Sequence, residues 1–248
     1  MYYLEEERQD ASFPWANHVL MGAMLCCFAY ELTLGPAFKS FLTTYGWIPA
    51  QFSLALTQGQ FPASSSLVVC LFLHGNGLHL VGNLLCLFFL GNAVEARLGA
   101  VRYVVLYLCG NVIALLTQAA MAPFSSTPMI GSSGAIAAVA GVYCLLFFSP
   151  QAPATTTPPS PQPLEGTPTI LFLGGWILFH LVGGVSVYTF GETAVFPSTH
   201  IAWGAHIGGF LGGIILGPLL LSSSEKRRRR PVADIVPFML HRPKSLLR

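Results

Sequence analysis

Charged side chains are almost absent from most of this chain. Only 9% of its 248 residues are Asp, Glu, Lys or Arg, against about 25% in an average soluble domain. Between Leu32 and Ser224 the charged residues are Lys39, Glu95, Arg97, Arg102, Glu165 and Glu192. A chain with so little charge cannot cover itself with a polar surface, whereas a helical backbone satisfies its own hydrogen bonds in lipid. The sequence therefore predicts an all-α membrane protein.

Six apolar segments account for most of the chain. They cover residues 18–36, 78–94, 101–121, 133–149, 170–190 and 201–221. Each is long enough to cross a hydrocarbon core of about 30 Å, although the second and fourth are short. Residues 37–77 are too long for a simple turn, so we expect a folded first loop with short helices in or on the membrane. The expected fold is a six-transmembrane-helix bundle with a long membrane-associated first loop.

The regions outside this bundle differ from it in composition. Residues 1–17 are acidic and polar and form an N-terminal segment before a six-span domain at 18–221. Within that domain, residues 150–168 are rich in Pro and Thr and are expected to be an exposed, flexible connector. The tail at 222–248 contains five consecutive basic residues at 226–230. Such a tail indicates contact with anionic lipid, and no nucleic-acid partner is expected.

The basic tail also orients the chain. Basic residues next to a span are enriched on the cytoplasmic side, and an even number of spans places both termini on one side. We therefore expect both termini in the cytoplasm. The loop between the second and third spans, with Arg97 and Arg102, is expected on the same side, and the first loop on the opposite side.

Three polar clusters interrupt the apolar segments, and polar residues inside a membrane are candidates for function. The clusters are "HGNGLHLVGN" with His74, His79 and Asn83; "GSSG" with Ser132 and Ser133 between Gly131 and Gly134; and "WGAHIGGFLGG" with His206. The glycines of the third cluster by themselves favour close helix packing. A histidine in this position needs a partner or a cavity, and a purely structural histidine is an open alternative.

Ser133 is the candidate partner of His206. The fourth segment is short, so its first residue is expected below the outer interface yet at a helix N-terminus. First-turn amides lack intrahelical partners and stabilise negative charge. The alternative is that Ser132 or Ser133 only caps the helix.

The first cluster supplies hydrogen-bond donors. His79 and Asn83 are four residues apart and share a helix face, and both can donate to a developing negative charge. His74 is expected to fix the loop that enters the span. With Ser133 and His206 this makes a nucleophile, a base and donors, which is the set needed for acyl transfer. No metal-ligand spacing occurs, and no cofactor is expected.

The order of these motifs resembles that of the rhomboid intramembrane serine proteases, of the basic six-span bacterial type. The chain carries HxxxxHxxxN as His74, His79 and Asn83; GxSG as Gly131, Ser133 and Gly134; AHxxGxxxG as Ala205, His206, Gly209 and Gly213; and ExRxG from Glu95 and Arg97. The resemblance runs from about Tyr45 to Gly217.

The resemblance implies a serine endopeptidase with a Ser/His dyad. Ser133 would be the nucleophile and His206 the general base, and the Ser133 amide, His79 and Asn83 would form the oxyanion hole. The implied substrates are single-span membrane proteins, cut within or near the span from the extracytoplasmic side. The implied location is a bacterial plasma (inner) membrane. In some members of the family an aromatic residue four positions after the serine supports the histidine. This sequence has Ala137 at that position.

Two other classes of protein are consistent with parts of this pattern. A catalytically inactive rhomboid-like protein that binds membrane clients typically lacks the serine or the histidine, and both are present here. A transporter or channel would explain histidines inside the membrane, but paired ionisable groups and repeated broken spans are missing from the sequence.

Overall fold

The computed structural model describes residues 13–60, 65–147, 174–175 and 202–221. Every regular element within these ranges is a helix, and the one strand-like pairing there is an isolated antiparallel bridge between Trp47 and Met129. The prediction of an all-α fold is therefore confirmed. The connector at 150–168, the tail at 222–248 and the first twelve residues lie outside the described residues.

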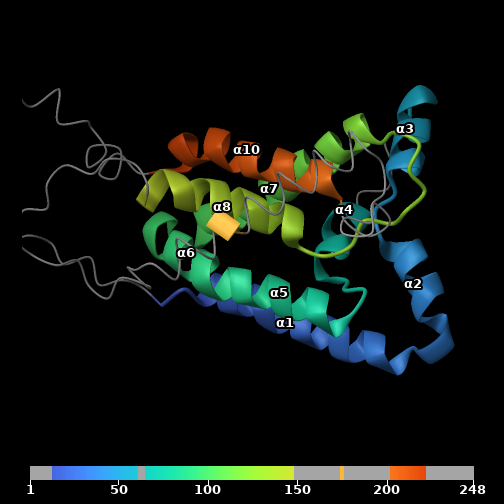
Figure 1. Ribbon diagram of the computed structural model, residues 1–248, viewed down its shortest axis with the longest axis horizontal. Coiled ribbons are helices and arrows are strands. Elements are labelled where there is room, and N and C mark those ends of the chain that lie inside the picture. The colour runs from blue at the N-terminus through green and yellow to red at the C-terminus, as the bar shows by residue number, and fades with distance from the viewer. Residues whose placement is uncertain (1–12, 61–64, 148–173, 176–201, 222–248) are drawn as a thin grey trace, which may run out of the picture.

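Membrane-spanning helices form the body of the molecule (Figure 1). The helices long and apolar enough to cross a membrane are Gly77–Leu98 (α5 Gly77–Cys86, η3 Leu87–Gly91 and α6 Asn92–Leu98), α7 (Ala100–Met121) and α10 (Trp203–Leu220). A fourth candidate joins α1 (Trp15–Thr33) to the helical segment Gly35–Tyr45 across a bend of 116°. Helix α8 (Ser133–Phe147) is apolar but shorter. Of the predicted fifth span at 170–190 only residues 174–175 are described, so the count of six stays a prediction.

The second span is longer than the sequence predicts, and the expected loop after it is missing. The π-helical segment η3 continues α5 directly into α6, which ends at Leu98. Only Gly99 separates α6 from α7, and its φ of 76° is easy for glycine and unfavourable for other residues. Arg97 and Arg102 therefore lie in helices and not in a loop.

The first loop consists of short helices, as expected. They are η1 (Gly35–Ala37), α2 (Phe38–Tyr45), α3 (Pro49–Thr57), α4 (Ser65–Val69) and η2 (Cys70–Phe72). In Figure 1, α2 and α3 lie at one end of the bundle, opposite to α6. Backbone hydrogen bonds fasten this loop to the segment before α8. They are the paired bonds between Trp47 and Met129, the bond from the Ala50 N–H to the Ser125 carbonyl, and the bond from the Gly131 N–H to the Cys70 carbonyl.

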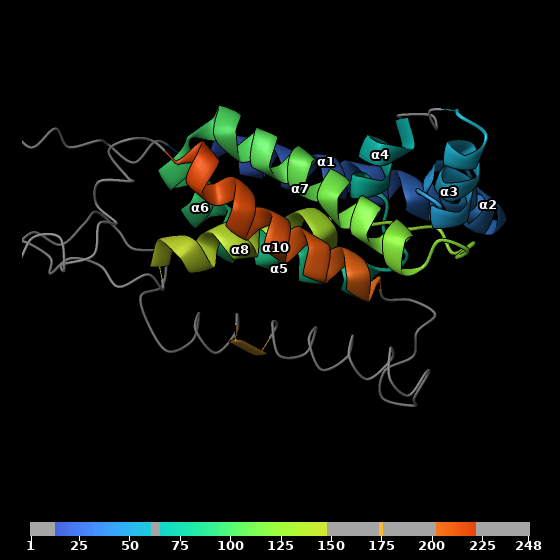
Figure 2. The same cartoon turned by 90° about the horizontal axis from the view of Figure 1, so that it is seen from above.

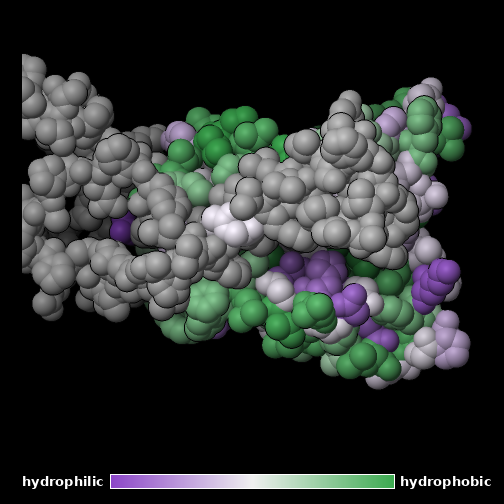
Figure 3. Space-filling view, viewed as in Figure 1, coloured by the Kyte–Doolittle hydropathy of each residue, from purple (hydrophilic) through white to green (hydrophobic). Residues whose placement is uncertain are grey.

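Apolar side chains on the outside of the bundle follow single helix faces. On α7 the exposed stripe repeats every three or four residues: Val101, Val105, Leu108, Val112 and Leu116. Similar stripes are Val81, Leu85 and Phe88 on the second span, and Leu211, Ile215 and Leu219 on α10. Figure 3 shows apolar surface along the flanks and hydrophilic residues toward the end with α2 and α3. Exposed apolar stripes of this extent mark a lipid-facing surface.

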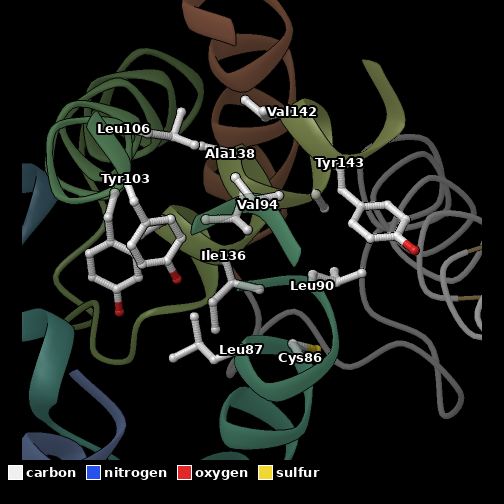
Figure 4. Close-up of a cluster of buried hydrophobic side chains, with 14 of the residues drawn as sticks. Cys86, Leu87, Leu90, Val94, Tyr103, Leu106, Ile136, Ala138, Val142 and Tyr143 are labelled. Atoms are coloured by element: carbon white, nitrogen blue, oxygen red, sulfur yellow. The ribbon is translucent and has the colours of Figure 1, made fainter. Parts of the chain in front are cut away.

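The interior is apolar and tightly packed around α8. Figure 4 shows Leu87, Leu90 and Val94 of the second span around Ile136 of α8, and Leu106 of α7 next to Ala138. Helix α8 packs against α7 and α10, which lie beside it in both views (Figures 1 and 2). Small residues permit this approach, because a side chain at Gly110 would overlap the Ala138 side chain and one at Gly213 would overlap the Ala138 carbonyl.

A distal cluster of polar residues, Asn17, Asn92, Glu95 and Tyr103, joins α1 to the second and third spans at the α6 end. The Glu95 carboxylate accepts hydrogen bonds from the first-turn N–H groups of Ala16 (3.0 Å) and Asn17 (2.6 Å). The Asn17 amide donates to the Leu87 carbonyl in η3 and to the Asn92 oxygen, both at 2.8 Å, and accepts from the Tyr103 hydroxyl at 2.6 Å. Glu95 of the ExRxG motif thus caps the N-terminus of α1.

Candidate active site

Ser133 and His206 lie within hydrogen-bond distance of each other. The His206 Nε2 atom is 2.8 Å from the Ser133 Oγ atom, although 73 residues separate them in the sequence. Ser133 is the first residue of α8, and His206 lies in the first turn of α10. The hydroxyl of a serine is activated when a neighbouring base can accept its proton. This pair has that geometry.

Glycines set the distance between the two helices that carry the pair. A side chain at Gly209 would overlap the Gly134 carbonyl, and its Cβ would lie 3.1 Å from the Ala137 Cβ. A Cβ on Gly134 would lie 2.7 Å from the Ala114 Cβ of α7. Gly134 and Gly209, together with Gly213 against Ala138, therefore act through close packing. They bring the helix starts near enough for Ser133 to reach His206.

The surroundings of His206 include a tryptophan and a glutamine that the sequence analysis did not single out. Ala137 is fully buried and presents no ring to the histidine. The Trp203 ring lies one turn before His206, perpendicular to the imidazole, with 6.5 Å between ring centroids. The Gln118 side-chain oxygen on α7 accepts a hydrogen bond from the Ala205 N–H at 3.2 Å. The Gln118 bond holds the start of α10 against α7, and Trp203 is the ring that lies beside His206 where Ala137 offers none.

Ser132 faces away from this pair. Its side chain is fully buried, and its hydroxyl lies 3.8 Å from the Met24 sulfur of α1. Ser133, in contrast, is partly exposed. Of the two hydroxyls in GSSG, the one nearest the histidine is therefore that of Ser133.

Gly131 brings the serine loop against the second span. Its N–H donates to the Cys70 carbonyl at 2.8 Å, and its φ is +91°, a conformation that favours glycine. A Cβ at this position would lie 2.5 Å from His79 Cε1 and 3.3 Å from Asn83 Nδ2. The missing side chain thus lets the backbone two residues before Ser133 touch the two candidate oxyanion donors.

His74 holds Asn83 in place. Its Nδ1 atom is 3.0 Å from the Phe72 carbonyl, which can only accept, so Nδ1 carries the proton and Nε2 is free to accept. The Asn83 Nδ2 group donates to that Nε2 at 3.0 Å. Burial, and secondarily the neighbouring His79, lower the pKa of His74 to about 4, so the ring is neutral at pH 7. An Asn amide has two N–H donors, so the second remains for another acceptor.

Two further polar residues hold the loop that enters the second span, and the sequence analysis missed both. Asn76 is the N-cap of α5, and its side-chain oxygen accepts from the His79 N–H at 2.9 Å. Glu31 near the end of α1 accepts from the His74 N–H with both carboxylate oxygens, at 3.1 and 3.2 Å. Glu31 lies inside the first predicted span at 18–36, so a search for ionisable residues within spans includes it.

The described residues contain no group of three or more His, Cys, Asp or Glu side chains that could hold a metal ion. The site offers instead a hydroxyl beside an imidazole, with an amide, a second imidazole and a helix N-terminus nearby. These are the groups that attack a carbonyl and stabilise the resulting oxyanion.

Comparison with known proteins agrees with this arrangement. A family model for the rhomboid domain matches residues 62–223, which is more than half of the chain. A curated relative, "RHOMBOID-like protein 7" of Arabidopsis thaliana, is 25% identical over 183 residues, covering 72% of this chain and 50% of the relative. The chain thus spans about half the length of that relative. Because the matched segment includes the second and third spans, α8 and α10, where the polar clusters meet, the chain belongs to the rhomboid family.

Proposed function

We propose that this protein is an intramembrane serine endopeptidase that cleaves single-span membrane proteins within or near their transmembrane segments. The observation that carries the proposal is the 2.8 Å contact between Ser133 Oγ and His206 Nε2. The family supports a protease-like fold, and the presence of both side chains in contact favours catalysis over client binding alone.

The proposed reaction begins with attack by Ser133. Its oxygen bonds to the carbonyl carbon of the substrate while His206 Nε2 takes the hydroxyl proton, and the carbonyl electron pair moves to oxygen. The oxyanion then collapses, the C–N bond breaks, and His206 returns the proton to the leaving amine. In the second half-reaction His206 takes a proton from a water molecule as that water attacks the acyl ester. The bond to the Ser133 oxygen then breaks, and His206 returns the proton to that oxygen as the acid product leaves.

The oxyanion hole would consist of the Ser133 N–H, Asn83 and His79. The Ser133 N–H belongs to the first turn of α8, where the helix dipole favours negative charge. Asn83 has the N–H that His74 does not use. Preorganised donors in a low-dielectric site gain strength as charge develops in the transition state.

The proposed placement in the membrane follows from the charges. The basic tail at 222–248 and an even number of spans support a cytoplasmic location for both termini, and the site lies at the bundle end with α2 and α3, which would be extracytoplasmic. The proposed catalytic unit is the six-span domain at 18–221, flanked by a cytoplasmic segment at 1–17 and the tail. The resemblance to the basic six-span type of rhomboid is what supports a bacterial plasma (inner) membrane as the proposed location.

A serine-reactive fluorophosphonate probe tests the nucleophile directly. The detergent-solubilised protein should be labelled, Ser133→Ala should not be labelled, and Ser132→Ala should keep substantial labelling and cleavage of a model single-span substrate. Ser132 is the matched control because it is adjacent and of the same type but faces Met24. Equal labelling of the wild type and Ser133→Ala, or loss of labelling only in Ser132→Ala, would contradict the assignment.

A further inference from the structure

A buried carboxylate lies near the candidate oxyanion hole without being part of it. Glu31 is 2% exposed and lies in the last turn of α1. Both of its oxygens lie within 3.2 Å of one donor, the backbone N–H of His74. Burying a carboxylate for the sake of packing is unfavourable, so this contact calls for an explanation.

Glu31 is connected to Asn83 through the backbone and then the ring of His74. The His74 backbone, which Glu31 holds, belongs to the short stretch between η2 and α5. The ring of the same residue is fixed by the Phe72 carbonyl and accepts from the Asn83 amide. Moving the His74 backbone therefore moves the acceptor that decides which way the Asn83 amide faces.

We propose that Glu31 is a positioning residue for the candidate oxyanion hole. It anchors His74 so that the imidazole holds one Asn83 N–H and leaves the other oriented for an oxyanion. The kinetic part of this inference rests on the proposed protease function, and the orientation of Asn83 does not. A carboxylate suits the task because its two oxygens both lie within reach of the one backbone N–H, at 3.1 and 3.2 Å.

A second buried carboxylate provides a matched control. Glu95 is 3% exposed and also accepts backbone N–H groups, but those of Ala16 and Asn17 at the α6 end of the bundle. Loss of either carboxylate leaves buried amides without their acceptor. Only loss of Glu31 disturbs the His74 ring that accepts from Asn83. A difference in kcat between the two variants therefore measures the positioning of Asn83, and not the general effect of removing a buried carboxylate.

The kinetic test compares Glu31→Ala, Glu31→Gln and Glu95→Ala as folded, detergent-solubilised full-length protein. Glu31→Ala should lower kcat by about 10-fold with KM nearly unchanged, less than the roughly 100-fold or more for losing a donor outright. Glu31→Gln keeps an acceptor oxygen and should recover most of kcat. Glu95→Ala should lower Tm while its folded fraction keeps kcat. If Glu31→Ala lowers Tm and leaves kcat at the wild-type value, the proposal is wrong.

A double-mutant cycle tests whether Glu31 acts through Asn83. In an Asn83→Ala background the donor is already gone, so Glu31→Ala should reduce kcat by less than twofold further. A full additional 10-fold loss would mean that Glu31 acts by another route, and the proposal would fail.

A readout without catalysis separates this inference from the proposed function. In protein labelled with 15N at asparagine, the side-chain amide signals of Asn83 should shift or broaden in Glu31→Ala and stay near their wild-type positions in Glu31→Gln and Glu95→Ala. Unchanged Asn83 signals in Glu31→Ala would overturn the positioning role. If the wild type neither cleaves nor is labelled, the protease proposal fails, and the 15N result still decides the role of Glu31.

Discussion

Polar side chains gather at two places in this apolar bundle, the candidate active site and the distal cluster of Asn17, Asn92, Glu95 and Tyr103. In the distal cluster Asn17 is fully buried, and its amide donates two hydrogen bonds and accepts one. At the site end Ser133 and His79 are partly exposed, and Asn83 uses one donor on His74. The polar groups of the distal cluster satisfy each other's hydrogen bonds, whereas the candidate active site keeps polar groups available for a bound molecule.

The difference shows that identical residue types serve different purposes in the membrane. A satisfied network rigidifies the packing, whereas buried donors without a final acceptor are unfavourable until a charge appears. We therefore expect substitutions at the site end to lower mainly turnover, and substitutions in the distal cluster to lower mainly stability. The following predictions test that separation, starting with the largest effect on turnover.

Replacing His206 by alanine should reduce turnover most. General base catalysis contributes about 10² to 10⁴-fold, and a nucleophile and its base act as a unit, so cleavage should fall by roughly 10⁴-fold or more. The variant should still fold and melt cooperatively, because α10 keeps its close glycine packing against α8. Cleavage of a model substrate beside a melting curve gives both values, and substantial remaining turnover would refute the dyad.

Loss of either candidate donor should be the next largest effect. Asn83→Ala and His79→Ala should each lower kcat by roughly 100- to 1,000-fold, or about 2.7–4 kcal/mol, with KM nearly unchanged. The two effects should be less than additive if both side chains bind one oxygen. If they only support the first loop, the variants will lose Tm while the folded enzyme keeps its kcat, and steady-state kinetics distinguish these outcomes.

Gly131→Ala should reduce turnover by about 10-fold, since a displaced His79 loses part of what a donor contributes. The new methyl group would stand 2.5 Å from the His79 ring, and the positive φ adds about 1–2 kcal/mol of backbone strain. The comparison is Gly22→Ala on α1, where nothing lies within 4 Å of the new Cβ and the backbone is helical. Equal turnover in the two variants would show that the missing side chain at Gly131 does not determine the position of His79.

Asn17→Ala should leave turnover within about twofold and lower stability. It removes the acceptor of the buried Tyr103 hydroxyl and the donor to Asn92, and an unsatisfied buried group costs about 1–3 kcal/mol. Chemical or thermal unfolding in detergent measures the loss, and kcat is measured at a temperature where the variant is folded. A large fall in kcat of the folded variant would remove the distinction between the two clusters.

Acid should destabilise the site end through His74. Burial and the neighbouring His79 lower the pKa of His74 to about 4 from 6.5. The His74 ring takes up a proton below about pH 6.5 in the unfolded chain, but only near pH 4 in the folded protein. The free energy of unfolding is therefore unaffected by His74 above about pH 6.5, and it decreases as the pH falls from about 6.5 to about 4. His74→Gln should show a smaller fall in Tm between about pH 7 and 5 than the wild type, although His79 and Glu31 also face this region. An identical fall in both would contradict the role of His74.

The residues of the candidate site could be identified from local sequence patterns. The contacts that hold these residues in place could not. Ser133, His79, Asn83 and His206 stood out because polar groups are rare in an apolar chain. Glu31 carries the same signal as an ionisable residue in a predicted span, but its partner could not be predicted, because that partner is the backbone of His74, 43 residues away, and no spacing encodes the contact. The second span was predicted to end at residue 94, but α6 continues it through Glu95 and Arg97 to Leu98, past the point where the apolar residues end.

The sequence by itself determined that the chain is helical, where most spans lie and which polar residues interrupt them. Lipid offers the backbone no partners, so composition alone imposes helices there. Only the tertiary structure decided which polar groups meet. Ser133 reaches His206 because Gly209 and Gly213 let α10 approach α8, and Asn83 faces the serine loop because His74 and Glu31 hold it. Such contacts depend on packing between distant segments, which no local sequence pattern specifies.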